Sequence, residues 1–337
     1  MDSRQRVVKA IHFGRPDRPP ISHAILPSAQ YHYGKALTEI LETVHEDFGW
    51  QFLSDLPRDE LPPMYRLGAN VDSFGTVWKV TEEGRCGIPV EFPLKDYAMY
   101  GDYVWPEFGA GTPKCRLYSG HMEGTSAEYY ARGGWIVFFE QLQQLRGIES
   151  LLADLMDEPR ELFRLRDDML KFNLRWIDRW LEHEYQGLHF ADDWGTQKNL
   201  MVPPRIWRSF FKPAYAEMFD KVKSAGLDVW FHSDGDITEI LPDLVELGVD
   251  VLNCQVSLMD RDRIGSRFAG KICFRTDLDR QKVMPYASPA EVKEYIFGLF
   301  DVLGTRDGGI IACGEISEDI PLANIRAMYE AFMEYRH

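Results

Sequence analysis

Short apolar runs that end abruptly in polar residues recur along the chain, and this pattern constrains the fold more than any other feature. The clearest run is Val229–Ile237, in which Val-Trp-Phe leads directly into His232, Asp234 and Asp236. A short apolar run that ends at a glycine-containing turn is typical of a buried strand. The next residues have apolar side chains at helical spacing. This stretch is therefore predicted to be a strand, a polar turn and a helix, the repeating unit of parallel α/β proteins.

Eight candidate strands of this kind are present, and predicted helices separate most of them. They cover residues 21–26, 50–53, 135–140, 187–195, 229–237, 249–254, 271–275 and 309–313. Eight strand–helix units in about 250 residues, plus one insertion, are typical of a TIM barrel. A doubly wound sheet is the alternative, but the Gly-x-Gly-x-x-Gly turn of that fold follows none of these strands. We expect a single α/β domain over residues 1–337, a TIM (β/α)8 barrel.

Residues 54–134 break the alternation between the second and third predicted strands. This region is rich in proline, glycine and aromatic residues and contains short strand-like pieces at 72–80 and 87–94. Long insertions in α/β domains often form lids or binding loops. We expect a β-rich insertion that covers one face of the domain. Its aromatic side chains either pack a minor core of their own or contact a substrate.

Charge and composition exclude several classes of partner. The net charge of −15 argues against binding to nucleic acid or to anionic membranes, because both require a basic surface. No apolar stretch approaches the roughly 20 residues that span a bilayer, and the first residues lack the apolar stretch of a secretory signal. A cytoplasmic location is expected. The five scattered cysteines fit reduced thiols rather than a disulfide framework: Cys86, Cys115, Cys254, Cys273 and Cys313.

In a TIM barrel the C-terminal ends of the strands converge on one site. The predicted strand ends carry one imidazole, two thiols, an arginine and several carboxylates: Glu140, Asp192, Asp193, His232, Asp234, Cys254, Arg275, Cys313 and Glu315. Catalytic zinc commonly has three protein ligands and one open position, with ligands drawn from histidine, cysteine and carboxylates. The strand ends therefore predict a Zn²⁺ site.

Each of these residues also has an ordinary structural interpretation. A histidine at a strand end is often only hydrogen-bonded, and Asp234 can cap the following helix. Cys254 lies inside an apolar strand and fits a small core residue, whereas Cys313 is the last apolar residue before a polar turn. Asp192 and Asp193 either pair with an arginine or form a coupled pair in which one carboxyl has a raised pKa.

Four segments resemble motifs of the uroporphyrinogen decarboxylase superfamily. They are Phe231-His-Ser-Asp-Gly-Asp-Ile237, the downstream segment 241–253, Ala191-Asp-Asp-Trp-Gly-Thr-Gln197 and the N-terminal Arg15-Pro-Asp-Arg-Pro-Pro20. The resemblance covers nearly the whole chain, is weakest over residues 54–134, and implies a TIM barrel.

Within that superfamily, the decarboxylases carry an arginine-rich segment after the first strand, which holds the carboxylates of the substrate without any cofactor. The equivalent segment here, residues 21–30, contains no arginine. A porphyrinogen with many carboxylates would also approach a chain of net charge −15 unfavourably. Porphyrinogen decarboxylation is therefore not expected.

The other branch of the superfamily comprises cobalamin-dependent methyltransferases that use zinc and a separate corrinoid protein. In members that act on coenzyme M, the resemblance implies a His-x-Cys pair after strand five and a cysteine after strand eight. His232 and Cys313 match this pattern, but Asp234 replaces the first cysteine. A carboxylate ligand makes the metal a stronger Lewis acid toward oxygen, which suits removal of a methyl group from an ether.

We therefore expect a corrinoid-dependent methyltransferase that demethylates a methyl ether or a similar methyl–oxygen donor. Zn²⁺ would be held by His232, Cys313 and a carboxylate, Asp234 or Glu315, and the methyl group would pass to cobalamin on a corrinoid protein. The catalytic carboxylates, which orient the substrate or handle a proton, are expected to be Asp192, Asp193 and Glu140.

Three other functions stay open. The first is a metal-independent decarboxylase or lyase that acts on a small acid through Asp192, Asp193 and Arg275. The second is a methylcobalamin:thiol methyltransferase, and the third is a barrel that serves only as a binding module. The expected partners are a corrinoid protein and a small methylated substrate, and a homodimer is one assembly to be tested.

Overall fold

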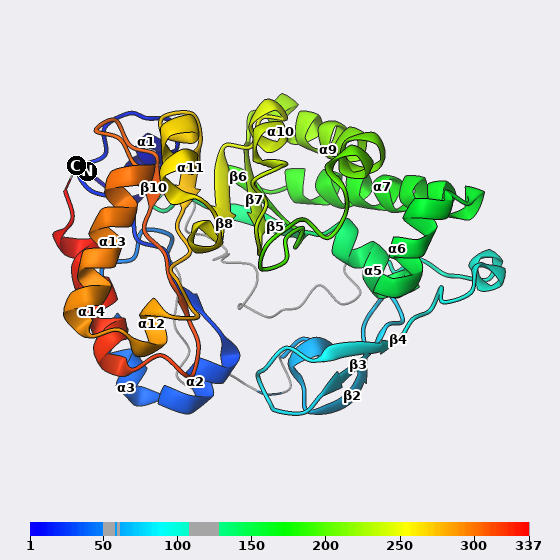
Figure 1. Ribbon diagram of the computed structural model, residues 1–337, viewed down its shortest axis with the longest axis horizontal. Coiled ribbons are helices and arrows are strands. Elements are labelled where there is room, and N and C mark those ends of the chain that lie inside the picture. Colours follow the sequence, from blue (N-terminus) through cyan, green and yellow to red (C-terminus); the bar gives the residue numbers. More distant parts are fainter. Residues whose placement is uncertain (50–57, 59–60, 108–127, 337) are drawn as a thin grey trace.

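A parallel sheet of six strands forms the centre of the protein, and helices pack around it (Figure 1). The computed structural model describes residues 1–49, 58, 61–107 and 128–336. The strands are arranged in the order β10-β9-β8-β7-β6-β5, so each lies beside its neighbour in the chain. Their bounds are β5 Arg132–Ile136, β6 Gly187–Ala191, β7 Asp228–Ser233, β8 Val251–Cys254, β9 Cys273–Arg275 and β10 Ile310–Ile311.

The N-terminal segment extends this sheet beyond β10. Ile21 forms a parallel bridge with Ala312, and β1 (Ala24–Ile25) pairs in parallel with β11 (Glu315–Ile316). The second predicted strand, residues 50–53, lies outside the described residues, as does the rest of the connection through residue 57. Strand order and direction in the described residues thus fit a TIM-barrel arrangement.

Helices follow the strands as the βα pattern predicts. β5 is followed by α5 (Phe139–Arg146), α6 (Ile148–Asp157) and α7 (Arg160–Leu181); β6 by α8 (Pro204–Ile206), the π-helix η4 (Trp207–Phe211) and α9 (Lys212–Ser224). β7 is followed by α10 (Leu241–Glu246), β8 by η5 (Val256–Leu258) and α11 (Arg261–Phe268), and β9 by α12 (Val283–Tyr286) and α13 (Pro289–Leu303). The remaining helices are α1 (Ser3–Ile11), α2 (Pro27–Tyr33), α3 (Lys35–Leu41) and α14 (Leu322–Glu334).

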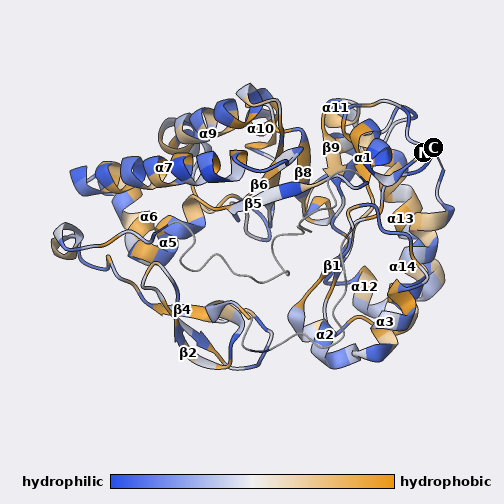
Figure 2. Ribbon diagram, turned by 180° about the vertical axis from the view of Figure 1, so that it is seen from behind, coloured by the Kyte–Doolittle hydropathy of each residue, from blue (hydrophilic) through white to orange (hydrophobic). Residues whose placement is uncertain are grey.

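Burial on both faces explains why the strands are apolar runs rather than alternating ones. Every residue of β6 and β8 is buried, as is usual for a parallel sheet covered by helices. The helix α7 buries one stripe, including Leu162, Leu165 and Met169, and exposes hydrophilic side chains elsewhere (Figure 2). Among the described helices, none combines the length and apolarity needed to cross a membrane.

The third predicted strand was placed too far along the chain. Residues 135–140 were expected as a strand that ends in Glu140, but β5 ends at Ile136 and Glu140 lies in the first turn of α5. The cause is tertiary: the carboxylate of Asp192 accepts hydrogen bonds from the backbone N–H groups of Phe138, at 3.0 Å, and Glu140, at 2.8 Å. These bonds satisfy the N–H groups that a helix start leaves without partners, so the helix begins earlier than the apolar run indicates.

A three-stranded antiparallel sheet lies within residues 54–134. Its strands are β2 (Gly68–Val71), β3 (Val77–Val80) and β4 (Ile88–Glu91), and short 3₁₀-helices stand on either side, η2 (Pro63–Tyr65) and η3 (Tyr97–Gly101). It lies apart from the six-stranded sheet (Figure 1). The region is tied to the helices after β5, because Tyr97 donates to Asp154 of α6 and Tyr100 to Asp168 of α7, both at 2.7 Å.

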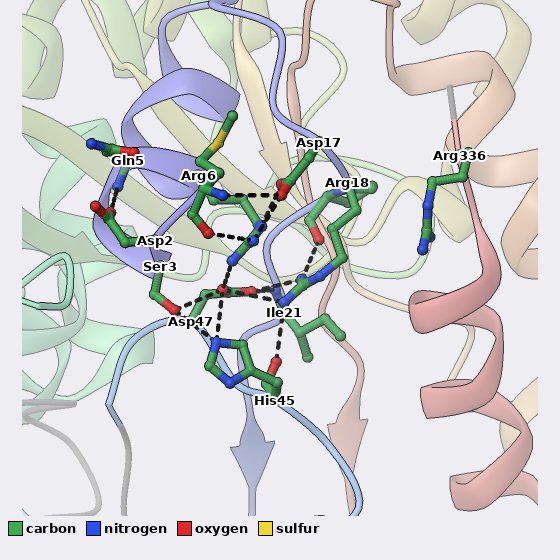
Figure 3. A network of polar contacts seen from close by, with 12 residues as sticks. Asp2, Ser3, Gln5, Arg6, Asp17, Arg18, Ile21, His45, Asp47 and Arg336 are labelled. Carbon is green, nitrogen blue, oxygen red and sulfur yellow. Dashed lines mark hydrogen bonds and ion pairs between the residues drawn. The ribbon is translucent and has the colours of Figure 1, made fainter.

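A buried carboxylate joins α1 to the N-terminal loop (Figure 3). Asp47 has no exposed surface and accepts hydrogen bonds from Arg6 at 2.6 Å, Arg18 at 2.7 Å and the backbone N–H of Ile21 at 2.8 Å. Arg6 also binds Asp17 at 2.6 Å. The charged residues of the Arg-Pro-Asp-Arg-Pro-Pro segment thus hold the first strand in place.

Candidate metal centre and adjoining cavities

Three side chains at the C-terminal ends of β6 and β7 form a compact cluster. They are Asp193, His232 and Asp234, whose potential metal-binding atoms all lie within 4.8 Å of one another. Nε2 of His232 lies 3.6 Å from Oδ1 of Asp193 and 3.6 Å from Oδ1 of Asp234. One imidazole nitrogen and two carboxylate oxygens form a donor set for a divalent cation, with room for a substrate ligand.

The pairing of β6 with β7 places these residues together. Ala191 lies opposite His232 in the sheet, and the backbone N–H of Asp234 donates to Oδ1 of Asp193 at 2.8 Å. The two following turns then contact through their backbones. Gly235 has a φ of +81°, and a Cβ atom there would meet the carbonyl carbon of Gly195 at 2.1 Å. Only glycine fits this contact, which brings the two acidic turns side by side.

The orientation of the His232 ring is determined by its neighbour on β8. Oδ1 of Asn253 lies 2.7 Å from Nδ1 of His232, and Nδ2 of Asn253 donates to the carbonyl of Arg275 at 2.8 Å. That second bond fixes the orientation of the amide. Nδ1 must then carry the proton, so the lone pair of Nε2 points toward the carboxylates, as in metal-binding histidines. Burial lowers the pKa of His232, but Asp234, Asp193 and the bond to Asn253 outweigh burial and raise it.

The carboxyl groups around the cluster repel one another. Burial raises the pKa of Glu140 well above its usual range, and Asp193, Asp192 and Asp234 raise it further. Burial also raises the pKa of Asp193, where Asp234 adds to the effect and His232 opposes it. A cation between these groups would relieve this repulsion, so the electrostatics of the cluster fit a metal ion.

Asp192 is placed differently from its neighbour Asp193. Its side chain has no exposed surface, and besides the N–H groups at the start of α5 it accepts a hydrogen bond from Tyr215 at 2.5 Å. Burial raises its pKa to about 7. Asp192 is one of the predicted catalytic carboxylates, and both of its oxygens accept hydrogen bonds from within the fold. Its place is that of a positioning residue for α5 and Glu140.

His232 lies in β7 and Cys313 lies just after β10, and a metal site that they share stays a prediction. Among the described residues, the metal-binding cluster contains neither Cys313 nor Glu315. Cys313 is buried, and its backbone is bonded on both sides to Thr276, whose Oγ1 accepts from the Cys313 N–H at 2.9 Å and donates to its carbonyl at 2.7 Å. Burial raises the pKa of the Cys313 thiol, although Arg275 partly opposes this.

An arginine after β9 holds the carboxylates that were candidate ligands. Nη2 of Arg280 lies 2.9 Å from Asp234 and 3.5 Å from Asp277, and its Nη1 forms an ion pair with Glu315. Glu315 and Asp234 are therefore both partners of Arg280, and Asp234 is the one that also lies in the cluster with His232. Sequence reasoning missed both Arg280 and Asn253. Asn253 is a polar residue just before the end of the sixth predicted strand (249–254), a position that could have indicated it, whereas nothing local distinguishes Arg280 from other loop arginines.

Two cavities meet at His232. The larger, of about 840 Å³, has walls from α5, α7 and the 54–134 region, including Phe74, Trp78, Phe92, Met169, Phe172 and Trp176, and it also reaches Glu140 and Asp193. The smaller, of about 160 Å³, lies among the strands and is lined by Arg132, His189, Asn253 and Arg275. His232, Trp135 and Glu315 border both. A substrate at the cluster can therefore extend in two directions, one largely apolar and one cationic.

Comparison with known proteins agrees with the sequence motifs. The profile of the family described as uroporphyrinogen decarboxylase (URO-D) matches residues 137–335, more than half of the chain. A search of curated proteins found no match. A solved methyltransferase from Methanosarcina mazei is 14% identical, with 99% of each chain covered and a TM-score of 0.68, which indicates a shared fold. Dihydropteroate synthases from Xanthomonas albilineans and Coxiella burnetii match at 15% and 13% identity; the alignments cover 42% and 47% of this chain and 52% and 59% of theirs, with TM-scores of 0.31 and 0.34.

Proposed function

Because the chain belongs to the uroporphyrinogen decarboxylase (URO-D) family, we propose that it is a methyltransferase of the corrinoid-dependent branch. It would remove the methyl group from a methyl ether or a similar methyl–oxygen donor and pass it to cobalamin on a corrinoid protein. The observation that carries the proposal is the cluster of Asp193, His232 and Asp234 at the junction of two cavities.

The donor set of this cluster fits an oxygen-activating metal better than a thiolate-binding one. Zn²⁺ would be held by Nε2 of His232 and by the carboxylates of Asp193 and Asp234, without Cys313. When bound, the ion supplies Lewis acidity that stabilises negative charge on the oxygen that loses its methyl group.

The side chains around the cluster have separable roles. Asn253 keeps the proton of His232 on Nδ1, and Arg280 holds Asp234 in position through its ion pair of 2.9 Å. The carboxyl group of Glu140 lines the larger cavity together with Asp193. Its raised pKa means that it keeps a proton to a higher pH than an ordinary glutamate. Glu140 is thus a candidate to give a proton to the oxygen of the demethylated product.

A decarboxylase or lyase that acts on a small acid is the second candidate. It is favoured by one observation, the partly buried Arg132 and the buried Arg275 in the smaller cavity, because paired arginines are suited to binding a carboxylate. The two functions differ in their products. One consumes cobalt(I) cobalamin, and the other releases carbon dioxide.

The test is to incubate the purified, zinc-supplemented protein with a panel of methyl ethers and cobalt(I) cobalamin and to follow the cobalt spectrum. Conversion to methylcobalamin with at least one donor is expected, together with loss of at least about 100-fold in rate in Asp193→Asn. Asp157→Asn, on the surface of α6, is the matched control and should keep the rate. Carbon dioxide release from carboxylic acids, without methyl transfer, would overturn the proposal. Methylcobalamin consumption only in the presence of thiols would favour the thiol methyltransferase.

A further inference from the structure

The smaller cavity has a chemical character of its own. Successive strands of the sheet each contribute one side chain to its wall: Arg132 from β5, His189 from β6, His232 from β7, Asn253 from β8 and Arg275 from β9. Ser22 and His23 of the N-terminal segment complete the wall. At about 160 Å³, the cavity is close to the roughly 150 Å³ that holds one benzene ring in an engineered protein core.

Neither arginine of this cavity forms a close ion pair among the described residues; burial and Arg275 lower the pKa of Arg132, and the nearby carboxylate of Glu46 is among the groups that oppose this. Nη1 of Arg132 lies 3.2 Å from Nδ1 of His189, and its guanidinium lies 4.7 Å from the ring centroid of Trp230. Arg275 donates from Nη1 to Asn253 at 3.0 Å, and its other bonds are to Oγ of Ser22 and the carbonyl of His23. All these partners are neutral. Arg275 is buried and Arg132 is partly buried, so two guanidinium groups with too little negative charge beside them are costly, which indicates that an anion normally accompanies them.

The remaining groups of the cavity neutralise this charge only in part. Burial lowers the pKa of His23 to about 3, and burial and then Arg132 lower that of His189, so both imidazoles are neutral near pH 7. Two carboxylates reach the cavity, Glu315 and Glu46. Glu315 is paired with Arg280, and Glu46 accepts the N–H of Phe48 at 2.9 Å. With those two carboxylates already nearby, a single negative charge suits the arginines better than a phosphate dianion.

We propose that Arg132 and Arg275 bind a carboxylate group of the substrate in the smaller cavity, so that the methyl donor is a small methylated carboxylic acid. The inference rests on the proposed function and names its substrate class. His232 borders both cavities, so a substrate held by its carboxylate would present its methylated oxygen at the metal cluster. The larger cavity would then be the side from which the methyl group departs. These arginines come from β5 and β9 and not from the segment after the first strand.

A purely structural role is the competing explanation for Arg275. Its bonds to Ser22, Asn253 and His23 connect the N-terminal segment to β8, so its removal could destabilise the protein without any ligand. Arg132 makes one hydrogen bond and one ring contact and is less tied to the fold. A test must therefore include a readout that depends on the charge of the ligand and not only on the arginines.

Isothermal titration calorimetry on the wild-type protein provides this readout without cobalamin. The probes are 3-methoxybenzoate, methoxyacetate and benzoate, with 3-methoxybenzamide as the neutral partner of the first and inorganic phosphate as the competing anion. We expect 3-methoxybenzoate to bind at least about tenfold more tightly than the amide. Arg132→Met and Arg275→Met should each weaken carboxylate binding at least about tenfold while leaving amide binding within about twofold. Arg205→Met, an exposed arginine at the start of α8, should change neither.

Several outcomes would overturn the proposal. They are equal affinities for 3-methoxybenzoate and its amide, tightest binding of phosphate, no binding of any carboxylate, or unchanged carboxylate binding in folded Arg132→Met protein. If that variant does not fold, the ratio of the wild-type affinities for 3-methoxybenzoate and 3-methoxybenzamide still tests the proposal. Carboxylate binding without methyl transfer to cobalamin would keep this site and remove the proposed function. Demethylation of neutral ethers alone would keep the proposed function and remove this carboxylate-binding site.

Discussion

Nδ1 of His232 lies 2.7 Å from Oδ1 of Asn253, and this bond connects the candidate metal-binding cluster to the cationic cavity. The same oxygen accepts a hydrogen bond from Nη1 of Arg275 at 3.0 Å. One amide thus orients both a proposed metal ligand and a proposed substrate-binding residue. The first prediction therefore concerns replacement of Asn253.

Replacement of Asn253 by leucine should weaken zinc binding by about 10- to 100-fold, because His232 loses the acceptor that keeps its proton on Nδ1. Competition with a chromogenic chelator measures the affinity. Ser22→Ala is the matched control, since it also removes a partner of Arg275 but leaves His232 untouched. Equal zinc affinity in wild type and Asn253→Leu would show that the amide does not orient the ligand.

Arg280 should matter most when the metal is absent. It pairs with Asp234, Glu315 and Asp277, so Arg280→Met would leave three carboxylates without their common cation. We expect a lower Tm in the presence of a chelator, and a larger gain in Tm on addition of Zn²⁺ than in the wild type, because the ion replaces part of the lost charge. Differential scanning fluorimetry of both proteins with and without metal measures this. An equal zinc-induced shift would contradict the prediction.

The buried Asp47 should contribute strongly to folding. Removal of its carboxylate in Asp47→Ala would leave Arg18 bonded only to neutral carbonyl oxygens and Arg6 with one carboxylate, Asp17, instead of two, so the free energy of unfolding should fall by about 3–5 kcal/mol. The exposed pair between Arg15 and Asp307 offers the comparison. Asp307→Asn should change the free energy of unfolding by less than ~1 kcal/mol. Urea denaturation of the two variants measures both changes. A similar loss of stability in each variant would contradict a strong contribution of Asp47 to folding.

A pH effect should come from the N-terminal region. Nε2 of His12 lies 3.2 Å from Asp228, and the hydrogen bond to Asp228 raises the pKa of His12 although burial opposes it. A raised pKa in the folded state means that the ion pair stabilises the protein fully below pH ~6.5 and is lost as the pH rises through the folded pKa. Because His12 is about half exposed, the effect should stay below ~1 kcal/mol.

The variant His12→Gln isolates this contribution. It should be less stable than the wild type near pH ~5.5 and equally stable near pH ~8.5, as measured by urea denaturation. His183→Gln, at an exposed position after α7, should show no such difference. A loss of equal size at both pH values would mean that charge is not involved.

Much of the fold could be predicted because its signal is local. Buried parallel strands are continuous apolar runs, so the predicted starts of β6, β7 and β8 lie within two residues of the observed ones, although the predicted segments for β6 and β7 continue four residues past the observed strand ends. The polar residues after these runs indicated a site at the strand ends. The boundary at β5 could not be predicted, because the start of α5 depends on Asp192, more than fifty residues away in the sequence. Strand pairing across residues 50–53 stays a prediction.

Part of the candidate site could be predicted from the same local signal, the polar residues that follow buried strands. His232, Asp193 and Asp234 lie at the ends of two adjacent strands, so the chain order alone brings them together. Cys313 also follows a strand, but a sequence pattern does not show which way a side chain points. Its backbone is bonded to Thr276, and a role for its thiol as a metal ligand stays a prediction. Arg280 and the two-cavity arrangement depend on contacts between distant segments and leave no local pattern.

Metal analysis of the purified protein tests the central claim most directly. After passage through a chelator-containing column, zinc content is measured in the wild type, His232→Ala, Asp193→Asn and Cys313→Ser. About one Zn²⁺ per chain is predicted for the wild type and for Cys313→Ser, and less than about a tenth of that for the other two. Zinc that persists in His232→Ala but disappears in Cys313→Ser would contradict the proposed metal centre.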